Sequence, residues 1–176
     1  MTLVRSLRGA VAGGIAAGAV AAQMPLDKQL FDCDYDDTEI LGKFVSRGGE
    51  WRPIGVALHV QNGAVFGAAY ALGKPFVPGP PVLRGLLASL AEHMATWPAT
   101  RLVDRYHPAR QELVPLWRNR RALAQATWRH LLFGFVLGEL ERRLNAGLVS
   151  PPPGPPPDYA SNGHGSLDRA VSTVRD

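Results

Sequence analysis

Apolar residues fall into four long runs, which polar or proline-rich segments separate. Each run has roughly 18 to 21 residues, and at 1.5 Å per residue a helix of that length crosses the ~30 Å hydrocarbon core of a bilayer. The pattern therefore predicts an all-α protein, a four-helix transmembrane bundle. We expect its helices at about residues 7–26, 53–73, 83–105 and 121–145.

The connections between these runs predict how the helices are joined. The link KPFVPGPPV at 74–82 is too short for anything but an antiparallel turn between the second and third helices. Pro98 lacks a backbone donor, so we expect a kink after Trp97. In the acidic run DCDYDDTE, Asp37 replaces the glycine and Lys43 the glutamate of a calcium loop. We interpret 27–52 as a solvated polar loop with a short surface helix.

The two ends of the chain have distinct compositions. PPPGPPP at 151–157 is typical of polyproline, and the polar remainder is too poor in apolar residues to fold alone. We therefore predict a membrane domain at 1–146 and a flexible, disordered Pro-rich C-terminal tail at 147–176. A cleaved signal peptide at 1–21 is an alternative for the N-terminus. The four-residue glycine spacing at 9, 13, 14 and 18 favours a helix that packs closely against another helix instead.

Composition and charge narrow the classes of partner. The chain has 46% hydrophobic residues, a net charge of +4 and a pI near 9.6. Its basic residues concentrate where apolar runs end, where they would meet phospholipid headgroups. We therefore expect the lipid bilayer as a partner. No basic stripe is interleaved with aromatic residues, so we expect no nucleic acid. Cys33 is the single cysteine, which excludes an internal disulfide. Both sides of the predicted membrane domain carry basic residues, so their distribution leaves the orientation open.

Polar residues inside the apolar runs gather at one depth. Counted from the side that bears the acidic loop, His59 lies about 8 Å deep, His130 about 12 Å and His93 about 13 Å. Ionisable groups in hydrocarbon are costly and should face the bundle interior or a wet cavity. Glu92 and Arg129 come from antiparallel neighbours and are expected to neutralise each other. The predicted polar pocket comprises His59, Asn62, Glu92, His93, Arg129, His130 and Gln23.

Three interpretations of this pocket stay open. Its side chains can simply hydrogen-bond across helices and fix the packing. They can form a half-channel that handles a proton, an ion or a small solute, since histidine titrates near neutrality. Alternatively His59, His93 and His130 ligate a metal or haem iron, although no HxxxH or CxxC spacing supports this. No GxSxG nucleophile elbow occurs, and we expect no enzyme.

Three segments carry a family resemblance: GVALHVQNGAVFGAAY, LRGLLASLAEHMATWP and WRHLLFGFVLGELERRLN. They resemble successive segments of the YagU-like bacterial inner-membrane proteins, a family without an assigned biochemical function. The resemblance covers most of 9–145 and implies a multi-pass protein of the cell inner (plasma) membrane. It places the family's histidines on His59, His93 and His130. This chain departs from the family at Gln23, where a glutamate is expected, and at Asp27-Lys28, which replaces a proline pair.

Two functions follow as expectations. The first is a membrane protein whose polar pocket handles a proton, an ion or a small solute. The second is a non-catalytic accessory or scaffold subunit, whose Gly/Ala helix faces contact other membrane proteins and whose proline-rich tail recruits a soluble partner. The sequence names neither a substrate nor a cofactor.

Overall fold

A computed structural model describes residues 2–148, and within this range every regular element is a helix. The all-α prediction is therefore confirmed for the described residues, while the predicted tail beyond residue 148 lies outside them. The α-helices are α1 (Thr2–Phe31), α2 (Asp37–Val45), α3 (Trp51–Gly73), α4 (Pro81–Thr96), α5 (Thr100–Tyr106) and α6 (Arg120–Asn145). Two short 3₁₀ helices, η1 (Lys74–Phe76) and η2 (Trp97–Ala99), complete the order.

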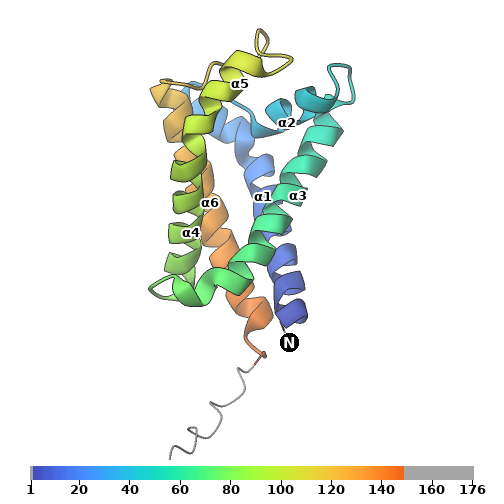
Figure 1. The fold of residues 1–176 in the computed structure, drawn as a ribbon. Coiled ribbons are helices and arrows are strands. Elements are labelled where there is room, and N and C mark those ends of the chain that lie inside the picture. Colours follow the sequence, from blue (N-terminus) through green and yellow to red (C-terminus); the bar gives the residue numbers. More distant parts are fainter. Residues whose placement is uncertain (1, 149–176) are drawn as a thin grey trace, which may run out of the picture.

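The four long helices form two pairs, which contact each other through α1 and α6. Helix α1 packs against α6, while α3 packs on α1 and α4 packs on α6 (Figure 1). The N-terminus, the α3–α4 turn and the end of α6 lie at one end of the bundle, and α2 and α5 lie at the other (Figure 1). The predicted antiparallel α3–α4 turn is therefore present.

Local sequence explains most of the helix boundaries. Asp36 caps α2 by accepting hydrogen bonds from the backbone N–H groups of Thr38 and Glu39, at 2.9 and 3.1 Å. The expected break at Pro98 appears as η2, which separates α4 from α5. Helix α1 differs from prediction because it continues through Pro25 to Phe31, beyond the expected end at residue 26. Tertiary contacts at Asp27, described below, hold this extension.

Glycines bring the helix backbones together at three crossings. In the α1–α3 crossing, a Cβ on Gly13 would overlap the carbonyl oxygen of Gly63. Added Cβ atoms at Gly85 of α4 and Gly42 of α2 would likewise overlap backbone carbonyls of α6 and α3. Only residues without a side chain allow backbones to approach so closely. The predicted spacing marks a close helix contact at Gly9 and Gly13, whereas a Cβ at Gly18 would meet nothing within 4 Å.

The interior combines polar side chains and small residues with a few large aliphatic ones such as Leu116 and Leu137, and many other large apolar side chains face outward. The most deeply buried large side chains include Arg129, His93, Gln125 and Asp27. Leu7 and Val65 are exposed by 58% and 64%, and Phe135 by 53%. Charged side chains such as Arg129 and Asp27 are seldom fully buried unless they are paired, as these two are.

Only α1 among the described helices is both long and apolar enough to cross a membrane by length and composition. A soluble core helix or an N-terminal signal sequence passes the same test, so this is weak support for a membrane location. The helical bundle is present, whereas four membrane crossings are not confirmed.

Candidate functional site

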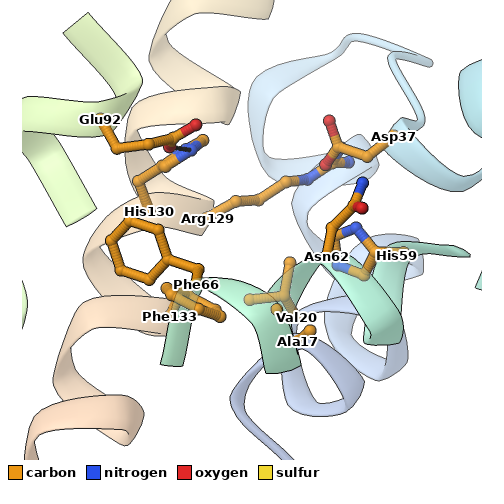
Figure 2. Close-up of a pocket in the computed structure, with 11 residues that line it drawn as sticks. Ala17, Val20, Asp37, His59, Asn62, Phe66, Glu92, Arg129, His130 and Phe133 are labelled. Atoms are coloured by element: carbon orange, nitrogen blue, oxygen red, sulfur yellow. Dashed lines mark hydrogen bonds and ion pairs between the residues drawn. The ribbon is translucent and has the colours of Figure 1, made fainter. Parts of the chain in front are cut away.

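A cavity of about 150 Å³, with both polar and apolar side chains in its wall, lies near the middle of the bundle, where the α1–α3 pair faces the α4–α6 pair (Figure 2). Helices α1, α2, α3, α4 and α6 all contribute to its wall. The lining side chains that carry charge or hydrogen-bonding groups are Asp37, His59, Asn62, Glu92, Arg129 and His130. Phe66 and Phe133 form an apolar wall, with ring centroids 5.5 Å apart.

The cavity is organised around Arg129, which is 2% exposed. Its Nε and one Nη donate to the two carboxylate oxygens of Asp27, each at 2.7 Å. The other Nη donates to Asp37 Oδ2 at 3.0 Å. Bidentate pairing of this kind satisfies a buried guanidinium that would otherwise be very costly. The predicted pairing of Arg129 with Glu92 is wrong, because Arg129 pairs with Asp27 and Asp37.

Neighbouring groups hold the two aspartates in place. Gln125 donates to Asp27 Oδ1 at 2.6 Å, and the Tyr35 carbonyl accepts from Arg129 at 2.8 Å. The Tyr35 hydroxyl donates to Asp37. Burial, reinforced by the Asp37 carboxylate, raises the pKa of Tyr35 well above its usual value. The phenol therefore stays protonated and keeps Asp37 directed toward Arg129 and the cavity.

Glu92 and His130 share a proton on the opposite wall (Figure 2). His130 Nδ1 lies 2.8 Å from the carbonyl oxygen of Ala126, which can only accept, so Nδ1 carries a hydrogen. His130 Nε2 lies 3.1 Å from Glu92 Oε2. This contact is either imidazolium to carboxylate or neutral imidazole accepting from a carboxylic acid. In both cases the pair holds one exchangeable proton and no net charge.

His93 lies behind His130, with ring centroids 4.3 Å apart and the planes stacked. The Thr127 hydroxyl donates to the Leu123 carbonyl at 2.8 Å, so its oxygen accepts from His93 Nε2 at 3.0 Å. His93 Nε2 is thus protonated and engaged. The metal hypothesis for His59, His93 and His130 gains no support from this geometry, since residues 2–148 contain no group of three or more His, Cys, Asp or Glu side chains arranged to hold a metal ion.

His59 has an unused hydrogen-bonding group. Its Nε2 is buried and has no hydrogen-bond partner among the described residues. Asn62, three residues further along α3, lies beside it on the same wall (Figure 2). A buried polar atom without a partner costs free energy, so a ligand or water that bonds to His59 Nε2 gains the corresponding stabilisation.

The structure brings together five of the seven predicted pocket residues: His59, Asn62, Glu92, Arg129 and His130. His93 is excluded by His130, and Gln23 lies outside the wall, where its amide donates to Asp27 and accepts from Trp128 Nε1 at 3.1 Å. Sequence reasoning missed Asp27 and Asp37, which it assigned to a solvated loop. One signal was present, because Asp27 follows Gln23 by four residues and so shares its helix face.

The charged side chains around the cavity carry a net negative charge. Asp27 and Asp37 face the single guanidinium of Arg129, and the Glu92–His130 pair is neutral overall in either proton arrangement. One negative charge therefore remains beside the cavity, which favours a proton or a cation over an anion. Comparisons of the chain with protein-family models, with curated proteins and with solved structures found no match, so the resemblance to the YagU-like proteins stays a prediction.

Proposed function

We propose that this is a multi-pass membrane protein whose central cavity takes up a proton or a small cation. The membrane part of the proposal is supported by the large apolar side chains on the outside of the bundle and the polar groups within it. Glycine, alanine and paired polar groups make up much of the interior, beside aliphatic side chains such as Leu137, whereas Leu7, Ile15, Val65 and Phe135 are more than half exposed. Lipid accommodates such an exterior, and close packing with polar bonds replaces the hydrophobic effect inside.

The single observation that carries the functional part is the excess carboxylate at Arg129. A buried guanidinium with one carboxylate would be neutral and purely structural. Here Asp37 is a second carboxylate, and it lies on the cavity wall as well as 3.0 Å from the guanidinium. A proton or a small cation that enters the cavity neutralises the remaining charge.

The cavity also offers groups that can bind and pass on a proton. The Glu92–His130 pair holds one proton, and it can change which of its two members carries it without creating net charge. His59 Nε2, on the α3 wall, is free to hydrogen-bond to a water molecule or a solute. Phe66 and Phe133 present aromatic rings, which favour an ammonium group over a more strongly hydrated ion.

Proton flux into sealed vesicles tests the proposal. The full chain would be reconstituted into liposomes that contain a pH-sensitive dye, and a potassium potential would drive proton entry. We expect flux above that of empty vesicles, and at least a tenfold loss in Glu92→Gln, because the amide cannot share a proton with His130. Glu139→Gln is the matched control, since within residues 2–148 Glu139 pairs only with Arg142 and Arg143, toward the far end of α6.

Small cations would be tested in the same vesicles, by adding methylammonium and measuring its uptake. Asp37→Asn should abolish uptake while leaving the fold intact by circular dichroism. Wild-type flux equal to that of empty vesicles for both protons and methylammonium would rule the proposal out. So would equal flux in Glu92→Gln and Glu139→Gln.

A second candidate function is an accessory subunit of a membrane complex. It is favoured by an outer surface that continues from α4 into η2, where Ala91, Ala95 and Ala99 are exposed at four-residue spacing in the sequence. Small residues of this kind allow another helix to approach closely in lipid. Purification in mild detergent separates the two functions, because an accessory subunit should retain a stoichiometric protein partner.

A further inference from the structure

A second polar cavity, of about 160 Å³, lies at the end of the bundle that holds the chain's N-terminus. It is formed where α3 ends, α4 begins and α6 ends, far along the helices from the central cavity (Figure 1). The side chains in its wall that matter here are Tyr70, Lys74, Arg84, Glu141, Arg142 and Asn145. Nothing in the proposed function uses these residues.

The charges in this cavity do not cancel. Glu141 is 1% exposed, and Lys74 Nζ lies 2.7 Å from each of its carboxylate oxygens. Arg142 is neutralised outside the cavity by Glu139, at 2.9 and 2.7 Å. Arg84 has no carboxylate partner among residues 2–148, and its Nε is buried without a hydrogen-bond acceptor. One positive charge is therefore left, with an unused donor.

Asn145 adds an unused acceptor. Its side chain is 7% exposed, and its amide nitrogen donates to Glu141 Oε1 at 2.7 Å and to the Arg5 carbonyl at 3.5 Å. Both partners only accept, so the orientation of the amide is fixed. Asn145 Oδ1 is then buried with no donor. Two residues of the cavity wall thus have buried, unpartnered atoms, namely a donor on Arg84 and an acceptor on Asn145.

The start of α4 reinforces the preference for an anion. Helix α4 begins at Pro81, which is part of the cavity wall, and no side chain caps its first turn. The free N–H groups and the dipole at a helix N-terminus favour negative charge. This contribution acts in the same direction as Arg84, on a group that enters from the α4 side.

We propose that this cavity binds a phosphate group that also carries a hydroxyl, such as the headgroup of an anionic glycerophospholipid. The phosphate oxygens accept from Arg84 Nε and neutralise its charge, and the hydroxyl donates to Asn145 Oδ1. A volume of about 160 Å³ holds such a group, since it equals several waters at roughly 30 Å³ each. Free phosphate offers the same chemistry, and only the source differs.

Binding to the detergent-solubilised full chain tests the proposal with three probes. These are phosphatidylglycerol with two six-carbon chains, phosphatidylcholine with the same chains, and inorganic phosphate, each measured by isothermal titration calorimetry. We expect phosphatidylglycerol to bind and phosphatidylcholine, which lacks both the net charge and the hydroxyl, to fail. Inorganic phosphate binding as tightly as phosphatidylglycerol would support the site and identify free phosphate as its ligand.

Variants at the same end of the bundle make the test specific. Arg84→Gln should weaken phosphatidylglycerol binding at least about tenfold, because hydrogen bonds to charged groups are among the stronger ones. Arg143→Gln is the matched control, since Arg143 is exposed and pairs with Glu139, and it should bind within about twofold of wild type. Should Arg84→Gln lose its fold by circular dichroism, Arg84→Lys, which keeps the charge and lacks Nε, takes its place and should also bind more weakly.

Equal binding of phosphatidylglycerol by wild type and a folded Arg84 variant would overturn the proposal. The proposal would also be overturned if the protein bound neither phosphatidylglycerol nor inorganic phosphate. Neither result bears on the central cavity, because the flux assays test Glu92 and Asp37, which line that cavity and are not part of this one.

Discussion

Helix α1 has two neighbours, and it contacts them through opposite kinds of chemistry. Against α3 it presents bare backbone, with Gly9 and Gly13 against Gly63 and Gly67. Against α6 it presents Asp27, a carboxylate 1% exposed that is fully engaged by Arg129 and Gln125. The first contact depends on the absence of atoms, and the second on the presence of a matched charge.

The two contacts fix different properties of the bundle. Backbone contact sets how closely α1 and α3 approach, but glycines four residues apart permit a shift along the helix. A bidentate ion pair has one geometry, so Asp27 and Arg129 set the register of α1 on α6 and, through Asp37, the position of α2. The cavity lies where both conditions are met.

The largest effect is expected from removing the charge at the α1–α6 contact. Arg129→Met leaves Asp27 buried without a cation, which should destabilise the protein by about 3–5 kcal/mol. The free energy of unfolding would be measured by denaturation in mixed micelles. Asp27→Asn combined with Arg129→Met should recover part of the loss. Arg121→Met, which removes an exposed ion pair with Asp32, is the control and should change little; an equal loss in both would refute the assigned role of Arg129.

An intermediate effect is expected at the α1–α3 contact. In Gly13→Ala the new methyl group overlaps the Gly63 carbonyl and forces the helices apart, at a cost of about 1–3 kcal/mol. Gly18→Ala is the matched control in the same helix, because a Cβ there meets nothing within 4 Å. Alanine is the better helix former, so Gly18→Ala should be neutral or stabilising. Thermal midpoints that fall equally in both variants would show that backbone approach does not matter.

The smallest effect is expected at α2, which combines glycine contact with an ion pair. Burial tends to raise the pKa of Asp36, but hydrogen bonds from Lys28 and Thr38 outweigh it and hold this pKa below its ordinary value of 3.8. A carboxyl with a lowered folded pKa stabilises the protein above its unfolded pKa, and this contribution disappears as the pH falls through the folded pKa. Asp36→Ala should cost about 1 kcal/mol at pH 7.

The pH dependence separates the charge of Asp36 from its role as a helix cap. The difference in thermal midpoint between wild type and Asp36→Ala should shrink once the pH falls below 3.8. Asp36→Asn keeps a capping oxygen and loses only the attraction to Lys28, so it should lie between the two. A difference that stays constant from pH 7 down to pH 2 would contradict the assignment.

Several features could be predicted because they depend on neighbours in the chain. The four long helices follow the apolar runs, the break at η2 follows Pro98, and the close contacts follow the glycine spacing. The shared depth of His59, Glu92 and His130 also follows from helix length and direction alone. The pairing of the charged side chains could not be predicted in this way. Asp27 and Asp37, which lie outside the predicted spans, occupy the guanidinium of Arg129, and Glu92 pairs with His130.

The sequence by itself determined that this protein is helical, where its helices turn, and which faces are smooth enough to touch. Only the tertiary structure decided that Asp27 belongs to a buried ion pair and that His93 packs behind His130 instead of facing the cavity. The physical reason is that periodicity acts over a few residues, whereas the free energy of a buried charge depends on which group, about a hundred residues away in the chain, lies within hydrogen-bonding distance.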